Sequence, residues 1–417
     1  MEDLEEILNP KTLDPQFLGW KKKVILFLSG QTISLFGSSL VQFAIIWYIT
    51  LSTQSGSMMT IASLCAFGPQ VIISLFSGVW ADRYNRKLLI IGADALVATS
   101  TFILAMFFLT GHKSLEMVFL VSAIRSIGAG IQTPAVNAFL PQIVPPGKLI
   151  RVGGINGSLQ SVMFLLSPAA AGALLSATSI EYTFFIDVGT AIIAILIMFI
   201  LKAPVHEKAL LKQKGGYFKD LAAGLKYVGG SKFFRAYFIF YALFFFLIVP
   251  AVQLTPLMVS RTFGDEYWRL SIMEVVFSAG GIVGGIVISA WGGLKNRMHT
   301  IALCCIIFGI DTFLVGVVPG FIAFLILMLV AGVSVPFFTT PSMVLLQEQV
   351  DPNMQGRIFS LTQIIMTAMI PIGMAFFGPV ADQISIQTLM AVTGIGSAVL
   401  GVLIFFNPHF RSGLITG

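Results

Sequence analysis

The chain has 417 residues, of which 56% are hydrophobic and 11% are charged, and its 25 basic and 19 acidic residues give a net charge of +6. Soluble proteins carry about 25% charged residues, so this chain has too little polar surface to solvate a globule of its size. A soluble enzyme, a disordered protein and a fibrous repeat are therefore excluded, and the composition indicates a polytopic membrane protein.

Twelve segments are long and apolar enough to cross a bilayer, for which a helix needs about 20 mostly apolar residues. Their ranges are 24–51, 58–80, 88–110, 115–140, 152–177, 181–201, 236–258, 268–291, 299–318, 321–346, 357–381 and 386–406. An even number of spans puts both chain ends on one side of the membrane. We therefore expect an all-α integral membrane fold with twelve transmembrane helices.

Basic residues are distributed unequally between the two sides. The N-terminus, the loops after even-numbered spans and the C-terminus hold 21 of the 25. The opposite loops hold Lys113, Arg261 and Arg269, and Arg125 lies inside a span. Because cytoplasmic loops carry the excess of Lys and Arg, we expect both termini to be cytoplasmic. Residues 1–23 are polar and acid-rich and lack the apolar core of a signal peptide, so we expect a cytoplasmic N-terminal segment.

The only long connection, 202–235, divides the spans six and six. Its apolar residues recur at helical spacing, which predicts an amphipathic helix on the inner leaflet; an ordinary solvated linker is the alternative. These apolar residues are Phe218, Leu221, Ala222, Leu225 and Val228. We therefore expect two six-helix bundles, 24–201 and 236–407, followed by a cytoplasmic tail, 408–417.

Landmarks of the first half recur in the second at an offset of 211 residues: Trp80, Asn85 and Arg86 recur as Trp291, Asn296 and Arg297. Two halves with matching landmarks predict a pseudo-two-fold axis along the membrane normal. Transporters built in this way hold their substrate near the midplane between the halves and rock the halves to alternate access.

The loop after the second span has a distinctive order of residues, Gly78-Val79-Trp80-Ala81-Asp82-Arg83-Tyr84-Asn85-Arg86-Lys87. In this order Asp82 can cap the positive end of a neighbouring helix, and the arginines can pair with carboxylates across the seam between the halves. A plain positive-inside loop explains the cations but not the glycine and the aspartate. We therefore expect a charge latch at this turn.

This loop resembles the signature loop of the major facilitator superfamily. The family pattern of glycine, aspartate, arginine and a basic pair is matched by Gly78, Asp82, Arg83, Arg86 and Lys87. The resemblance covers nearly all of 24–406 and implies a transporter with a conformational latch in this loop. The copy in the second half has Gly293 in the aspartate position, so we expect no latch there.

Two further stretches resemble the bacterial branch that holds macrolide-efflux proteins and the enterobactin exporter. They are Pro141, Val144, Pro145, Leu149 and Asn156 after the fourth span, and Gln347, Val350, Gly356 and Arg357 after the tenth. The fifth span is similar to the antiporter motif of drug–proton exchangers at Pro168 and Gly172, with Ser167 and Ala171 in place of glycines. This similarity implies proton antiport.

Five ionisable residues lie within predicted spans and away from the ends of these spans: Arg125, Asp187, Glu274, Asp311 and Asp94. A charge in hydrocarbon costs about 3 kcal/mol or more, so each is a candidate functional residue. We expect Asp187 and Glu274 to face an outer cavity, where a partly dehydrated carboxyl can exchange protons; a structural pair with a hydroxyl or amide is the alternative. Asp311 is the fourth candidate for proton coupling and the substrate cavity with Arg125, Asp187 and Glu274, although ninth spans in this architecture usually stay outside the cavity. We expect Asp94 to support the nearby charged loop.

Arg125 occupies the place of the fourth-span arginine that the superfamily's drug–proton exchangers use in proton coupling. The alternative role is a structural tie to backbone carbonyls. Because a guanidinium stays charged at any physiological pH, we expect Arg125 to be balanced by Asp187, with Glu274 as the reserve partner.

The sequence and its resemblance together predict a proton-coupled exporter of a bulky, partly apolar, drug- or macrolide-like compound in the bacterial inner membrane. A siderophore exporter and a non-transporting membrane sensor or scaffold are the alternatives. No phosphate-binding or catalytic motif is present, so we expect neither an enzyme nor a cofactor. Cys65, Cys304 and Cys305 lie in apolar runs and are expected to be free thiols. The expected partners are a small molecule, protons and lipid, without nucleic acid, and the expected state is a monomer.

Overall fold

A computed structural model describes residues 17–201, 217–407 and 410, without the side chains of residues 79, 82 and 217–220. In this part of the chain twelve helical spans are long and apolar enough to cross a membrane, as the sequence predicted. The spans of the first half are α2 (Trp20–Thr53), α3 (Gly56–Arg83), α4 (Arg86–Leu109), α5 (Leu115–Ile143), α6 (Leu149–Ala177) and α7 (Ile180–Ile200). After α8 (Tyr217–Gly230), the second half contains α9 (Lys232–Leu247), α10 (Thr255–Thr262), α11 (Tyr267–Trp291), α12 (Arg297–Val317), α13 (Phe321–Gln349), α14 (Gln355–Gln383) and α15 (Ile386–Phe406).

The seventh span is interrupted. It runs from α9 through a π-helical turn, Pro250–Leu254, into α10. Pro250 lacks the backbone N–H that would continue the α-helical ladder, and irregular backbone inside a membrane is tolerated where it is covered by protein or lines a cavity.

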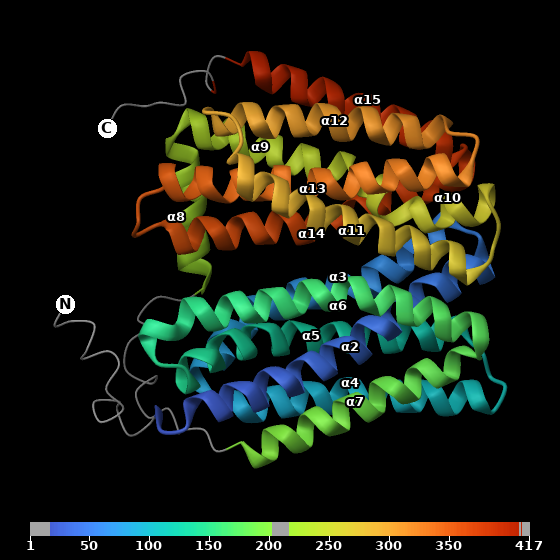
Figure 1. Cartoon of the computed structure of the whole chain (residues 1–417), viewed down its shortest axis with the longest axis vertical. Helices are drawn as coiled ribbons and strands as arrows, with labels where there is room; N and C mark the ends of the chain where they lie inside the picture. Colours follow the sequence, from blue (N-terminus) through green and yellow to red (C-terminus); the bar gives the residue numbers. More distant parts are fainter. Residues whose placement is uncertain (1–16, 202–216, 408–409, 411–417) are drawn as a thin grey trace.

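The helices form two bundles. The bundle α2–α7 lies in the lower part of Figure 1, and the bundle α9–α15, with α8, lies in the upper part. Between them, α3 lies beside α14 and α6 lies beside α11. Within the second bundle the packing of α11 on α13 depends on small residues. A Cβ atom on Gly280 or on Gly332 would lie 2.3 Å or 2.0 Å from a carbonyl oxygen of the other helix, which is the close helix approach that small residues permit.

The internal repeat is also visible in local hydrogen bonds. Asn85 and Asn296 each accept a hydrogen bond from the backbone N–H two residues ahead, at 3.0 and 2.9 Å, and so cap α4 and α12. Arg86 and Arg297 each donate to the carbonyl five residues before them, at 2.7 and 3.0 Å. The equivalent residues therefore have equivalent roles in the two halves.

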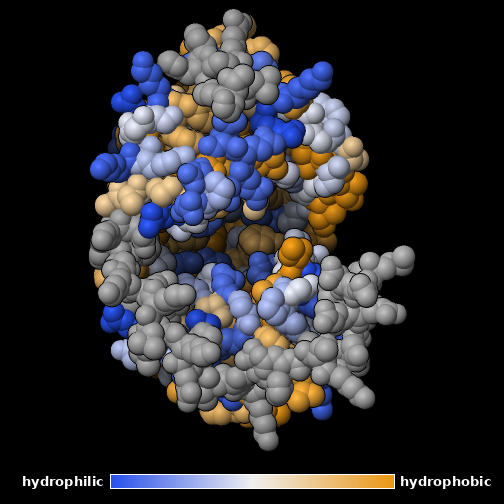
Figure 2. Space-filling model, turned by 90° about the vertical axis from the view of Figure 1, so that its left-hand side faces the viewer, coloured by the Kyte–Doolittle hydropathy of each residue, from blue (hydrophilic) through white to orange (hydrophobic). Residues whose placement is uncertain are grey.

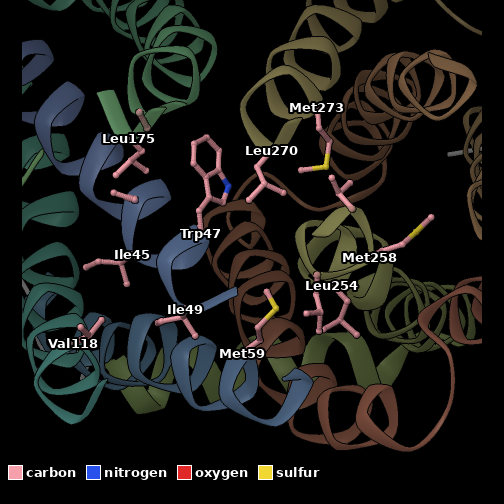
Figure 3. Close-up of a cluster of buried hydrophobic side chains, with 14 of the residues drawn as sticks. Ile45, Trp47, Ile49, Met59, Val118, Leu175, Leu254, Met258, Leu270 and Met273 are labelled. Carbon is pink, nitrogen blue, oxygen red and sulfur yellow. The ribbon is translucent and has the colours of Figure 1, made fainter. Parts of the chain in front are cut away.

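The two ends of the molecule differ in how the halves meet. We call the end of the molecule at which α8 lies, on the left in Figure 1, the basic end. The turns that join α3 to α4, α5 to α6, α8 to α9 and α11 to α12 belong to this end, and at these turns are Arg83, Arg86, Lys148, Lys232 and Arg297. The other end is called the opposite end. There, buried apolar side chains from both halves form one cluster (Figure 3). It contains Trp47, Ile49 and Met59 from the first half and Leu254, Leu270 and Met273 from the second.

At the basic end the described residues form a separate apolar cluster in each half. One surrounds Phe27 and Phe139 in the first half, and the other surrounds Tyr237 and Leu346 in the second. The halves are therefore packed together at the opposite end and are apart at the basic end.

The helix α8 lies across the basic end (Figure 1) and packs against α9 and α14. Of its predicted apolar stripe, Val228 is buried and Leu221 packs against the second bundle, whereas Leu225 is 53% exposed. The hydroxyl of Tyr227 accepts a hydrogen bond from the backbone N–H of Asp351 at 3.2 Å. Part of the apolar stripe thus faces protein rather than lipid. Residues 202–216 of the predicted connection lie outside the described residues.

Candidate functional site

A cavity of about 740 Å³ lies between the two bundles and is lined by helices of both. In Figure 2, which looks at the basic end, the surface is hollowed between the upper and lower halves. Because the halves are packed together at the opposite end, the cavity has its opening toward the basic end.

The two halves line the cavity with different chemistry. Seven of the eight amide side chains that line it belong to the first half: Gln31, Gln42, Gln70, Gln132, Asn137, Asn156 and Gln160. The second half contributes mostly apolar side chains, together with Gln253, Thr255, Thr312 and the two acids that line the cavity, Glu274 and Asp311. The only basic lining residue among those described is Arg125. The first half therefore presents hydrogen-bonding groups of no net charge, and the second half presents carboxyl groups in an apolar wall.

Arg125 and Asp187 form an ion pair inside the first half. Arg125 Nη1 donates to Asp187 Oδ2 and to the hydroxyl of Thr101, and its Nη2 donates to the backbone carbonyl of Ser38 at 3.1 Å. Asp187 also accepts hydrogen bonds from the hydroxyls of Ser38 and Thr101, both at 3.1 Å. These groups join α2, α4, α5 and α7. The charge of the guanidinium is thus balanced, and the structure brings together the pair that the sequence suggested.

A family model described as Major Facilitator Superfamily matches residues 27–374. The chain belongs to the Major Facilitator Superfamily. It is 32% identical over 381 residues to the macrolide efflux protein A of Streptococcus pyogenes, which covers 91% of this chain and 94% of the relative. It is also 32% identical over 322 residues to the macrolide efflux protein A of Enterococcus faecalis, covering 76% of this chain and 100% of the relative.

The fold agrees with this membership. A crystal structure of the nucleoside transporter NupG superposes with a TM-score of 0.68 over 95% of this chain and 100% of that chain, at 16% identity. At this identity the likeness shows the shared fold alone. The resemblance inferred from the loop motif is confirmed, and this member of the superfamily is a transporter.

Asp187 is not where the sequence suggested. Its side chain is fully buried behind Arg125, and it is not among the residues that line the cavity. The helical position alone put it near the membrane's outer side. Its actual environment is decided by the packing of α7 against α2 and α4, which turns this face of α7 into the interior of the first bundle.

Glu274 and Asp311 both line the transporter's cavity from the second half. Asp311 thus lines the cavity although it lies on the ninth span. Asp311 is 4% exposed, and its Oδ1 atom has no hydrogen-bond partner. Glu274 is partly exposed and has no hydrogen bond or ion pair within the described chain. The two groups are therefore available to a ligand or a proton.

Asp94 does not support the charged loop. It is 3% exposed and accepts hydrogen bonds from the hydroxyl of Ser34 at 2.9 Å and from Gln132 Nε2 at 2.7 Å, while its Oδ2 atom is buried without a partner. Ser34 and Gln132 line the cavity, so Asp94 holds two of the cavity's polar groups in place.

The signature loop of the superfamily lies at the basic end, beside the cavity opening. Arg86 donates to the carbonyl of Ala138 in α5 at 2.7 Å, and Lys87 donates to the carbonyls of Phe199 and Leu201 at 3.1 and 2.9 Å. Arg83 is exposed. The side chain of Asp82 lies outside the described residues. The described contacts of Arg86 and Lys87 thus brace α3 and α4 against their own half.

The antiporter-like motif of the fifth span lies where the two halves meet. The carbonyl oxygen of Pro168 accepts a hydrogen bond from the hydroxyl of Ser271 in α11 at 2.9 Å. A Cβ atom on Gly172 would lie 2.1 Å from the Cβ atom of Ser271, so only glycine fits this crossing of α6 and α11.

One set of site residues was missed by the sequence analysis. Gln31, Ser34, Ser38 and Gln42 occupy one face of α2 and line the cavity. Their spacing of three or four residues within an apolar span was a usable signal, because such a polar stripe faces protein or water rather than lipid.

Proposed function

We propose that this transporter exports a bulky, partly apolar compound that carries a protonatable amine, in exchange for protons and by alternating access. The observation that carries the proposal is the pair of carboxyl groups, Glu274 and Asp311, in an apolar wall of a cavity between the halves. A cation is the natural counter-charge, because the one lining arginine, Arg125, is already paired with Asp187.

The cavity's shape and chemistry fit a macrolide-like compound. A volume of about 740 Å³ accommodates a drug-sized ligand. The amide face of the first half can bind the oxygen atoms of a lactone ring and its sugars, and the second half can bind its apolar edge and amine. The two relatives at 32% identity bear the name macrolide efflux protein A, which supports the same class of substrate.

Exchange follows if a proton and the amine compete for the same carboxyl groups. With the cavity open to the cytoplasm, the cationic amine binds Glu274 or Asp311 and displaces a proton, because the ionised carboxylate is stabilised by an opposite charge nearby. After the halves rock and the substrate leaves outward, a proton from outside neutralises the carboxylate. The carboxyl group then returns with the halves to the cytoplasmic side.

The Arg125–Asp187 pair is the second candidate for the coupling site. It is buried beside the cavity, and protonation of Asp187 would leave the guanidinium to seek a partner among Ser38, Thr101 and a bound ligand. This alternative predicts that neutralising Asp187 alone abolishes the proton dependence of export.

We further propose that the basic end is cytoplasmic in the bacterial inner membrane, since it holds most of the basic residues, and that the chain works as a monomer of two bundles, 24–201 and 236–407. Gly78, Asp82, Arg83, Arg86 and Lys87 are proposed as a latch at this end. Pro168 and Gly172 are proposed as the contact of α6 with α11 that antiport requires.

The test is efflux of erythromycin, a macrolide that carries a tertiary amine, from a pump-deleted host with and without a protonophore. We expect the protonophore to stop efflux, and we expect Glu274→Gln and Asp311→Asn to reduce it at equal expression. Glu116→Gln is the matched control, because Glu116 is an exposed acid at the start of α5, away from the cavity.

Four results contradict parts of this proposal. Export that needs ATP and persists without an ion gradient refutes the proton drive. Normal export by both cavity variants moves the coupling site to Arg125 and Asp187. Export of an anionic siderophore, but of no amine-bearing compound, refutes the substrate class, and no flux of any compound would favour the sensor or scaffold.

A further inference from the structure

The helices α3 and α14 share an arrangement of residues. Gly56, Gly78, Ala81 and Asp82 of α3 recur as Gly356, Gly378, Ala381 and Asp382 of α14, at a constant offset of 300. Each helix therefore has a glycine at its start and a Gly-x-x-x-Asp sequence in its last turns. This offset is not that of the repeat between the halves, and it relates two helices that lie beside one another across the seam.

Because α3 and α14 run in opposite directions, the start of each helix meets the end of the other. At the opposite end the start of α3 and the end of α14 are in contact. A Cβ atom on Gly56 would lie 2.2 Å from the carbonyl oxygen of Gly378, and a Cβ atom on Gly378 would lie 1.8 Å from the hydroxyl of Thr60. The hydroxyl of Thr60 donates to the carbonyl of Met374 at 2.7 Å. Glycine at both positions permits the two backbones to touch.

Asp382 caps the start of α3 from the other half of the molecule. Its carboxylate accepts hydrogen bonds from the backbone N–H groups of Gly56 and Ser57, at 2.7 and 2.9 Å, and from the hydroxyl of Ser55 at 3.0 Å. A carboxylate at this position satisfies N–H groups that lack a helical partner, and it also meets the positive end of the helix dipole.

Arg261, at the end of α10, completes this contact. It donates to Asp382 Oδ1 at 3.2 Å, to the carbonyl of Ala381 at 2.8 Å and to the carbonyl of Gln54. Gln54 is the only non-glycine residue in the described chain with a positive φ, at 51°. This left-handed turn between α2 and α3 directs the Gln54 carbonyl toward the second half.

At the basic end the end of α3 and the start of α14 have no equivalent contact between their glycines. A Cβ atom on Gly78 or on Gly356 would have no atom of another element within 4 Å. Asp82 lies in the last turn of α3, and α14 begins at Gln355. The two glycines that are in contact at the opposite end thus have equivalents at the basic end, Gly78 and Gly356, that are apart.

We propose that Gly378 and Asp382 form a second latch, which holds the opposite end closed, and that this latch alternates with the one at Gly78 and Asp82. In this structure Asp382 caps α3. When the halves rock, Asp382 leaves the start of α3, and Asp82 caps the start of α14 around Gly356 in the same way. The two contacts exclude one another because α3 and α14 are rigid helices on separate bundles, so closing one end opens the other.

The free energies of the two contacts therefore set the balance between the two states. If only one end had such a latch, the transporter would mostly occupy the one state in which that end is closed, because an equilibrium shifts by the difference in free energy between the states. The inference rests on the alternating access proposed above, but testing it requires no transported compound.

The test is the distance between spin labels on the purified apo protein, in a chain without native cysteines. One pair, at His112 and Ile384, reports the opposite end, and the other, at Arg151 and Asn353, reports the basic end; all four residues are exposed. Asp382→Asn should lengthen the first distance and shorten the second. Loss of a charge-assisted contact is expected to change the ratio of the two states by about tenfold or more.

Four further variants make the result specific. Asp82→Asn should change the ratio in the opposite direction, and the double variant should return it toward that of the wild type. Asp265→Asn removes an exposed acid in the loop between α10 and α11 and should change nothing. If Asp382→Asn fails to fold, Arg261→Gln should give the same direction of shift.

The proposal is overturned if Asp382→Asn and Arg261→Gln leave both distances as in the Asp265→Asn control. It is also overturned if Asp82→Asn and Asp382→Asn shift the ratio in the same direction, or if the double variant matches either single one. Failure of erythromycin efflux in a chain whose distances respond as expected would count against the proposed function and not against the paired latches.

Discussion

Arg125 and Asp187 are joined by an ion pair that four helices of the first bundle enclose, with 8% of the arginine side chain and none of the aspartate side chain exposed. Every hydrogen bond described for the pair comes from within the same bundle. The pair therefore takes no hydrogen bond from the second bundle in this structure, and its first effect is on the stability of the half that contains it.

Breaking this pair on one side should destabilise the transporter more than removing it altogether. Arg125→Met leaves a buried carboxylate and Asp187→Asn leaves a buried guanidinium, each at a cost of about 3–5 kcal/mol in the free energy of unfolding. The double variant should recover most of this loss. The measurement is thermal unfolding in detergent with a thiol-reactive dye, which reports exposure of the buried Cys304 and Cys305. If the double variant is as unstable as the single variants, the imbalance of charge is not the cause of their instability.

Binding of an amine-bearing substrate should release protons from the purified protein. In the proposed exchange the displaced proton comes from Glu274 or Asp311, so proton release should fall as the pH rises and the empty site loses its proton. Glu274→Gln and Asp311→Asn should each reduce the release. Erythromycin-induced acidification in weak buffer across pH 6–9 measures it. Release that is unchanged in both variants but absent in Asp187→Asn would assign the proton to the buried pair.

A larger residue at the crossing of α6 and α11 should open the opposite end. Gly172→Val places methyl groups where Ser271 lies and should weaken the contact between the halves there, raising accessibility of the cavity from that end. Ser271→Gly should restore part of the contact. Gly189→Val is the control, since a Cβ atom on Gly189 meets nothing within 4 Å. The opening is measured as the reactivity of a cysteine at position 42, in place of Gln42, toward an impermeant reagent. Unchanged reactivity in Gly172→Val would contradict the prediction.

The orientation of the chain is tested on α8. A cysteine at the exposed Lys226 should react with an impermeant reagent only after the cells are opened, because the basic end is expected to be cytoplasmic. A cysteine at His112, in the loop between α4 and α5, should react in intact cells. The reverse pattern would invert the topology and with it the direction of export.

Much of the fold follows from composition. The number of spans, their places and the two equivalent halves were correct because apolar runs and repeated landmarks are properties of the chain. Site residues were harder to assign. The sequence predicted the partner of Arg125 because a buried guanidinium needs a carboxylate. The environments of Asp94 and Asp187 were not predicted, because which face of a helix points to the cavity depends on how the helices pack.

The sequence alone determined that this protein is a membrane-embedded, two-part helical transporter, since hydrophobicity, charge distribution and the signature loop all act locally along the chain. The tertiary structure alone decided which carboxyl groups are free. Asp187 is paired behind Arg125, and Glu274 and Asp311 line the cavity without a cation. It also decided that Asp382 reaches the start of α3, more than 300 residues earlier in the chain. Such relationships depend on the crossing of helices from different halves, where backbone approach and the direction of a side chain are set by packing, which no local pattern encodes.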